Sequence, residues 1–233
     1  MLAFVVRRLL ALPAVLFALS LVIVGLLQLL SPEQRAVAFV QNEQQMRNLE
    51  QIIREKGLDR PFYVQYWSWL KDALQGNLGF SKASNKPVLD TIKERFPATV
   101  ELALFASLPI IAFGIWLGTL AGLNKDGPID QLARIFAVIA YNVPTFVMGI
   151  LLLVVFYGFL GWAPGPGQLS PESQIALLLN PIPHRTGMLS IDALLAGNFT
   201  IFWDVLRHLI LPVITLTTVS SATLLKVTRS SML

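Results

Sequence analysis

The sequence contains no cysteine and few charged residues. Without cysteine, neither a disulfide framework nor a thiolate metal or redox site can form. Charged residues make up only 14% of the 233 residues and hydrophobic residues 55%, whereas soluble domains carry roughly 25% charged residues. The net charge of +4 is modest and the basic residues form no single stripe, which argues against nucleic-acid binding. This composition indicates a membrane protein.

Motifs of catalysis are also lacking. The sequence has no glycine-rich phosphate loop with its lysine, so the chain is not expected to hydrolyse nucleotide. It has no H-E-x-x-H motif, no G-x-S-x-G motif and no intramembrane carboxylate pair. His184 and His208 stand alone, with no second ligand at a metal-binding spacing. We therefore expect no catalytic residues and no metal site.

Four apolar stretches predict an all-α integral membrane protein, a polytopic helix bundle with about four spans. They cover roughly residues 9–30, 100–123, 132–160 and 208–225, and about 20 apolar residues suffice to cross a bilayer. The third is long enough to require tilt or a break. Lysine and arginine favour the cytoplasmic side, and those beside these stretches share one side if the N-terminus is cytoplasmic: Arg7, Arg8, Lys125, Arg134, Lys226 and Arg229.

The spans divide the chain into three regions. Residues 1–30 form a cytoplasmic N-terminus and the first span, residues 31–98 an extracytoplasmic helical segment, and residues 99–233 the main transmembrane domain. In the helical segment, "SPEQ" at Ser31 predicts a helix start and Gly57 a helix end. The aromatic run "RPFYVQYWSWLKDAL" fits either the headgroup zone of the membrane or the small core of this segment.

Small and polar residues mark the later spans. Gly114, Gly118 and Gly122 recur every four residues, which predicts a helix face for close packing. Pro144 must break the third span near the polar Asn142, and the freed carbonyls need partners or water. This break fits either a kink that lines a pathway or a satisfied kink between helices.

The fourth span, "LPVITLTTVSSATLL", is the most polar and includes Thr215 and Thr218. Each hydroxyl can bond to its own helix, but their number suggests that one face is turned away from lipid. A polar span with a proline suits a translocation path better than a lipid anchor. Glu101 is expected to place its charge at the N-terminus of the second span.

An ordered set of segments carries a resemblance to a known family. The segments are "MLAFVVRRLL", "GLDRPFYVQYWSWLKDALQGNLGFS", "PATVELALFA", "GTLAGL", "VPTFVMGILLLVVF", "GWAPGPG", "ILPVITL" and "TRSSML". Together they resemble the B-type inner-membrane permease subunit of oligopeptide and dipeptide ABC importers. The resemblance covers nearly the whole chain. It implies about six spans in an intact member, so residues 99–233 are expected to be a permease transmembrane domain that is incomplete at its C-terminus.

The resemblance also implies a function and partners. A second homologous permease subunit would complete the pore in the bacterial inner membrane. Two cytoplasmic ATPase subunits would bind ATP and Mg²⁺, and an extracytoplasmic substrate-binding protein would deliver peptides. This chain itself would bind no cofactor and no nucleic acid. The alternative is a non-transporting membrane scaffold or sensor whose outer segment binds a partner.

By the same resemblance, Asn142, Pro144 and Phe146 fall near the translocation path. The polarity of the fourth span adds Thr215 and Thr218 to the residues expected there. The residues Arg229, Ser230 and Ser231 form the cytoplasmic approach to the loop that docks on the ATPase. The chain ends before that loop, and we expect it to be part of a longer protein.

Overall fold

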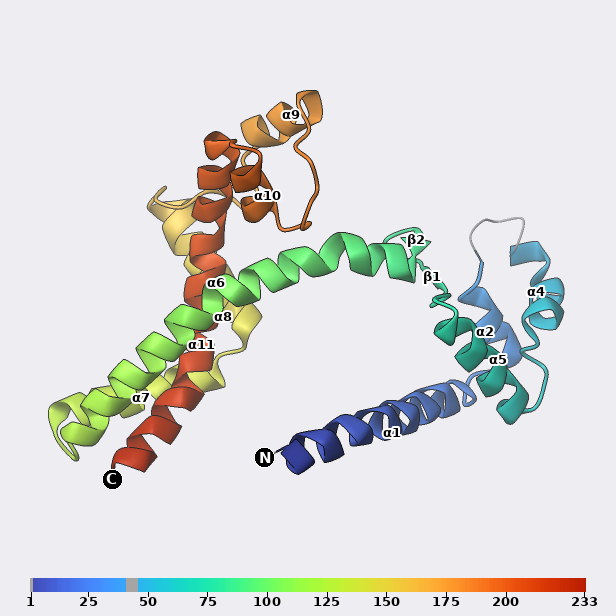
Figure 1. Ribbon diagram of the computed structural model, residues 1–233, viewed down its shortest axis with the longest axis horizontal. Coiled ribbons are helices and arrows are strands. Elements are labelled where there is room, and N and C mark those ends of the chain that lie inside the picture. The colour runs from blue at the N-terminus through green and yellow to red at the C-terminus, as the bar shows by residue number, and fades with distance from the viewer. Residues whose placement is uncertain (1, 41–45) are drawn as a thin grey trace. The chain divides into compact units, whose positions relative to one another are not determined.

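The computed structural model describes residues 2–40 and 46–233, and most of these residues are helical (Figure 1). The chain divides into two compact units, Met1–Lys93 and Glu94–Leu233. Residues 41–45, part of the predicted helical segment, lie outside the described residues.

The first unit contains short helices that follow one long apolar helix. Its elements are α1 (Leu2–Leu27), α2 (Pro32–Val37), α4 (Leu49–Lys56), α5 (Phe62–Leu74), β1 (Phe80–Ser81) and β2 (Lys86–Pro87). The strands pair antiparallel, with Phe80 opposite Pro87. Ser31 caps α2 as "SPEQ" predicts: its Oγ accepts the Gln34 N–H at 3.3 Å, and its own N–H donates to Gln34 Oε1 at 2.9 Å. Gly57 ends α4 in the left-handed conformation, as predicted.

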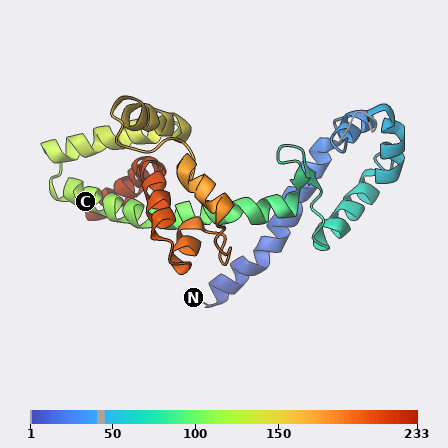
Figure 2. The same ribbon diagram turned by 90° about the horizontal axis from the view of Figure 1, so that it is seen from above.

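The long helices of the second unit surround α11. Its elements are α6 (Val88–Leu123, which begins in the first unit), α7 (Pro128–Asn142), α8 (Thr145–Leu153), the π-helical η1 (Val154–Phe159), α9 (Pro171–Leu179), α10 (Leu189–Leu195) and α11 (Phe199–Met232). Helices α7, α8, α9 and α10 all contact α11. Figure 2 shows the short α9 and α10 beside the first turns of α11.

The described residues include three helices that are long and apolar enough to span a membrane: Val6–Leu27, Val88–Leu123 and Phe199–Met232. A fourth span is possible if α7 and α8–η1, which meet at an angle of 102°, count as one broken span. Helix α6 begins at Val88, well before the predicted start near residue 100. Hydropathy detects only the part of a helix that suits lipid, and charged residues such as Asp90 and Lys93 do not end a helix.

The three glycines of α6 face α11. A Cβ atom on Gly114 would lie 2.9 Å from Leu224, one on Gly118 would lie 2.7 Å from Cβ of Thr228, and one on Gly122 would lie 2.7 Å from Cβ of Met232. The contacting positions are therefore four residues apart on both helices. A side chain at any of the three α6 glycines would clash with α11. Helices in lipid associate through such close contact because the bilayer provides no hydrophobic driving force.

Alanines continue this close packing on α7. Ala133, Ala137 and Ala140 are buried on one face of α7 and form a core cluster with Ala222 and Leu225 of α11. Their spacing of three and four residues is that of one helix face. Helix α11 thus packs against small residues on two neighbouring helices, which fixes its position in the unit.

Substitution of Gly118 by alanine should destabilise this unit. The added methyl group would meet both Cβ of Thr228 at 2.7 Å and the backbone oxygen of Leu225 at 3.0 Å, and overpacking typically costs ~1–3 kcal/mol. Thermal unfolding of the purified protein in detergent should show a lower midpoint. Gly158→Ala is the matched control, because a Cβ there meets nothing within 4 Å; equal midpoints for both variants would contradict the packing account.

Candidate functional site

The chain breaks between α7 and α8, where the sequence predicts a proline kink. Val143 is extended (φ −81°, ψ 122°) and Pro144 caps α8, so α7 stops at Asn142. The Asn142 Nδ2 donates to the carbonyl of Val138 at 2.7 Å, within the last turn of α7. The amide thereby satisfies a carbonyl of its own helix. The carbonyl that Pro144 leaves without its helical donor is that of Ala140, four residues earlier, so this hydrogen bond does not decide between a pathway-lining kink and a satisfied one.

The hydroxyls of α11 are satisfied to different degrees. Thr215 is buried, donates to the Leu211 carbonyl at 2.8 Å, and lies 3.7 Å from where a Cβ of Gly149 on α8 would be. Ser221 donates to the Thr218 carbonyl at 3.4 Å. The buried Oγ1 of Thr217 has no hydrogen-bond partner. The Thr215 hydroxyl is therefore satisfied within its own helix. The same side chain packs against α8.

The five residues predicted near a path do not form one lining within this chain. Phe146 is 69% exposed on α8, Asn142 is exposed at the end of α7, and Thr215 is buried against α8. Thr218 is half-buried, while Ser220 and Thr223 carry the exposed hydroxyls of the α11 run. A common lining would need a second chain opposite these helices.

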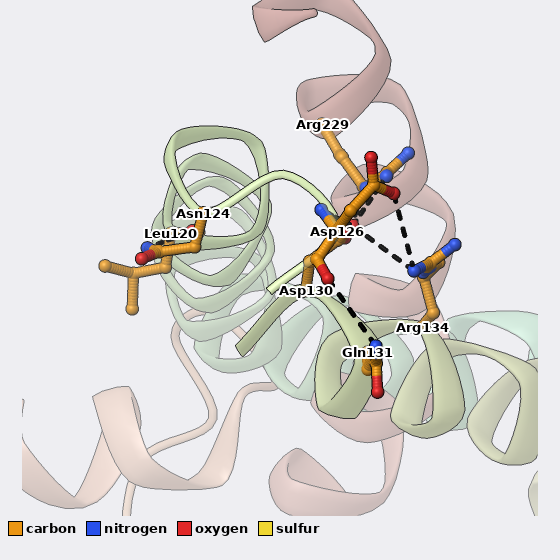
Figure 3. Close-up of polar contacts among 7 residues, drawn as sticks. All are labelled: Leu120, Asn124, Asp126, Asp130, Gln131, Arg134 and Arg229. Carbon is orange, nitrogen blue, oxygen red and sulfur yellow. Dashed lines mark hydrogen bonds and ion pairs between the residues drawn. The ribbon is translucent and has the colours of Figure 1, made fainter. Parts of the chain in front are cut away.

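A buried carboxylate joins the start of α7 to the end of α11 (Figure 3). Asp130 is fully buried, and the Arg229 guanidinium donates to both of its oxygens, from Nε at 2.5 Å and from Nη2 at 2.7 Å. The Asp126 N–H donates to the same carboxylate at 3.0 Å, and Arg134 Nη2 lies 3.5 Å away. We call the contact between Asp130 and Arg229 the α7–α11 clamp.

The turn before α7 brings the clamp carboxylate into position. The Gly127 N–H donates to the Asn124 carbonyl at 2.8 Å, and Asp126 has φ +59°, a conformation that aspartate tolerates in turns. This tight turn links α6 to α7. Two-point binding between arginine and carboxylate fixes orientation as well as distance, so the clamp ties the end of α11 to the α6–α7 turn. Of the predicted ATPase-approach residues, Arg229 is in the clamp, whereas Ser230 and Ser231 are exposed.

The link between η1 and α11 is folded onto α6 and α11. Residues 161–167, "GWAPGPG", contain no helix, as their prolines and glycines predict. The Asp204 carboxylate accepts from both the N–H and the Oγ of Ser170 at 2.9 Å, which fixes the start of α9. The buried Glu101 carboxylate accepts the Ser190 N–H at 2.6 Å.

The role expected for Glu101 is wrong. Because α6 already begins at Val88, Glu101 lies in the helix interior and cannot stabilise its N-terminus. Its carboxylate instead holds the link between η1 and α11, through the hydrogen bond from Ser190.

His208 Nδ1 lies 2.8 Å from the carbonyl of Asp204. No group of metal-binding side chains is found among the described residues.

Asp192 organises the loop before α10. Its carboxylate accepts from the N–H and Oγ1 of Thr186, both at 2.8 Å, and from the Gly187 N–H at 3.0 Å. Burial alone would raise the pKa of Asp192, but the hydrogen bonds outweigh it and hold the pKa below the ordinary 3.8. Gly187 has φ +76°, and a Cβ there would lie 2.8 Å from Pro97 of α6, so this loop packs closely on α6.

Sequence reasoning did not single out Asp130, Asp192 or Asp204. For Asp130 a signal exists: it follows "DGP" at a helix start and has Arg134 one turn later. Its partner Arg229 is 99 residues away, and no local pattern reveals that pairing. Asp192 lies in the short helix α10 and Asp204 near the start of α11, and both bind residues of the irregular link, where the sequence gives no periodicity to anchor a prediction.

These features define a multi-pass helical membrane protein with small-residue helix contacts and a broken third span. The chain belongs to the family of binding-protein-dependent transport system inner membrane components, whose match covers residues 114–233. Residues 1–103 match the N-terminal region of the membrane component of the same kind of transport system. The predicted family is therefore confirmed, and it is a family of transport permease subunits rather than enzymes.

Curated relatives carry peptide-transport names. The chain is 40% identical over 185 residues to a probable D,D-dipeptide transport system permease protein of Escherichia coli K12, covering 79% of this chain and 53% of that protein. It is 33% identical over 235 residues to a dipeptide transport system permease protein of Alkalihalophilus pseudofirmus, covering 100% of this chain and 68% of that protein. A di/tripeptide transport system permease protein of Pseudomonas aeruginosa is 34% identical over 233 residues, covering 100% of this chain and 67% of that protein. The chain thus spans about half to two thirds of the length of these relatives.

Removal of one partner of the α7–α11 clamp should destabilise the protein strongly, because it leaves a buried charge without compensation. We expect Asp130→Ala and Arg229→Ala each to lower the thermal unfolding midpoint by several degrees. The double variant should lose far less than the sum of the two, and the double-mutant cycle measures this coupling. Asp126→Asn is the control, since Asp126 is 71% exposed and its ion pair with Arg134 is long at 3.9 Å. Additive losses would show that the clamp is not a coupled pair.

The stability of the link should depend on pH through Asp192. Because its folded pKa lies below 3.8, the carboxylate contributes stability above about pH 4, and this contribution is lost as the pH falls through the lowered value. Asp192→Asn should therefore be less stable than the parent protein at pH 7, with a difference that shrinks toward pH 3. Thermal unfolding of both proteins across this range measures the difference. A constant difference would exclude the charge as its source.

Proposed function

We propose that this chain is part of the pore-forming permease subunit of an ATP-driven importer of short peptides. The observation that carries the proposal is the match over residues 1–103 and 114–233 to transport-system membrane components, together with relatives named for dipeptide and di/tripeptide transport. Peptide as the substrate class rests on those names.

The exposed faces of the helices support a second permease subunit as partner. Large apolar side chains remain exposed on α6 and α8, among them Leu108, Trp116, Phe146 and Ile150. In a membrane such faces are covered by lipid or by other helices. Because the few helices around α11 leave these faces uncovered, a pore would form between this chain and a homologous one.

The path would run beside the break at Pro144 and the polar face of α11. We assign Asn142, Pro144, Phe146, Thr215 and Thr218 to its neighbourhood. The exposed hydroxyls of Ser220 and Thr223 belong to the same proposal, because they are the α11 hydroxyls that a neighbouring subunit or water can reach. Packing between α8 and α11 at Thr215 would let a movement of one helix displace the other.

Energy would come from two cytoplasmic ATPase subunits that bind ATP and Mg²⁺, since the sequence has no phosphate-binding loop. The end of α11, with Arg229, Ser230 and Ser231, would face these subunits, and a substrate-binding protein would act on the opposite side of the inner membrane. This orientation places the N-terminus in the cytoplasm, in agreement with the positions of the lysines and arginines.

Uptake of a labelled dipeptide tests the proposal. A strain that lacks the gene should lose most uptake at micromolar dipeptide, and the full-length gene on a plasmid should restore it. Uptake of the corresponding free amino acid, measured in the same cells, is the control and should not change. Unchanged dipeptide uptake in the deletion strain, with no other peptide importer able to replace it, would overturn the function.

A further inference from the structure

Helix α5 contacts α1 through its aromatic face. Tyr66 is buried, its hydroxyl lies 2.8 Å from Ser20 Oγ, and its ring meets Phe17 edge-on with centroids 5.7 Å apart. Gln65, the preceding residue, accepts from Gln28 Nε2 at 3.3 Å, just beyond the end of α1. These contacts attach α5 to the last turns of a membrane-spanning helix.

The position of Ser20 in α1 sets the depth of α5. The span Val6–Leu27 has 22 residues, which at ~1.5 Å per residue matches a hydrocarbon core of about 30 Å. Ser20 lies about 10 Å before the end of that span, measured along the helix axis. The Tyr66 hydroxyl therefore reaches well below the level at which α1 leaves the apolar layer, and α5 cannot stand clear of the membrane.

Helix α5 also has an apolar face that is largely exposed in the described part of the chain. Tyr63, Trp67 and Leu74 are 71%, 68% and 81% exposed. At 3.6 residues per turn these positions fall within about 60° of one another. Ser68 and Asp72 lie on the opposite side of the helix and are exposed as well. Thus α5 has three faces: one aromatic against α1, one apolar and open, and one polar and open.

We propose that the face formed by Tyr63, Trp67 and Leu74, the α5 lipid face, binds lipid at the membrane interface where α1 ends. Helix α5 then lies along the membrane surface, with α1 beside it and Ser68 and Asp72 toward water. Tyrosine and tryptophan favour the headgroup level, and helices of this type bury their apolar face by about 5–10 Å. The inference depends on α1 as a membrane span and does not depend on peptide transport.

The contact with α1 favours lipid over a protein as the occupant of this face. A soluble partner that covered Trp67 would have to displace lipid at the depth fixed by Tyr66 and Ser20. The aromatic run thus serves both functions that the sequence allows: Phe62, Tyr66 and Trp69 form a stack with ring centroids 5.9 to 6.0 Å apart, while Tyr63 and Trp67 face the bilayer.

Spin labels can test the proposal, because these 233 residues contain no cysteine that would compete for the label; any cysteine elsewhere in the full-length protein is first replaced by serine. Single variants Tyr63→Cys and Trp67→Cys place a label on the α5 lipid face, and Ser68→Cys and Asp72→Cys place it on the polar face as matched controls. All four positions are exposed, so the helix should tolerate them. The full-length protein is reconstituted in nanodiscs of phosphatidylcholine and phosphatidylglycerol, with and without its partner subunits.

Electron paramagnetic resonance then compares the accessibility of each label to oxygen, which partitions into lipid, and to a water-soluble nickel complex. The oxygen-to-nickel ratio should be several-fold higher at positions 63 and 67 than at 68 and 72, in both preparations. High nickel accessibility at 63 and 67 would place the face in water and overturn the proposal. Low accessibility to both reagents in the assembled complex alone would identify a protein partner and overturn it equally.

Discussion

The structure depends on one constraint: apolar helices in lipid associate only where their backbones come close. Helix α11 meets this condition against Gly114, Gly118 and Gly122 of α6 and against the alanines of α7. The missing side chains of the α6 glycines make room for Leu224, Thr228 and Met232 of α11, so dispersion contacts replace the missing hydrophobic force. The positions of α7, α8 and the link before α11 all follow from that central helix, since each of them contacts it.

The buried carboxylates of the second unit each have hydrogen-bond donors around them. Asp130 is buried at the start of α7 and meets Arg229 at the end of α11, so the ion pair closes the same bundle that the glycines bring together. Glu101 and Asp192 accept backbone N–H groups of the link. A carboxylate with hydrogen-bond donors around it can be buried, and Asp130 and Glu101 each connect segments far apart in the sequence.

The sequence alone predicted a helical membrane protein, its apolar spans and the glycine face of α6, because these depend on local composition and helix periodicity. It predicted the break at Pro144, where a proline closely follows the polar Asn142, but not the 102° angle between α7 and α8. Proline alone does not decide the matter, because Pro97, Pro109 and Pro212 lie inside continuous helices. It misplaced the role of Glu101, because a helix can extend beyond its apolar part. The Asp130–Arg229 pair needed the fold, as does any contact between residues so far apart in the chain.

The hydroxyls of α11 show why polarity in a span does not by itself identify a water path. Thr215 is satisfied by its own helix and buried against α8, so it would be just as stable in a purely lipid-embedded bundle. Ser220 and Thr223 are exposed, and their side chains are free to meet water or a second subunit. Thr217 has a buried oxygen that lacks a partner. A path along α11 would therefore be lined by the exposed hydroxyls, and Thr215 would transmit movement between α8 and α11.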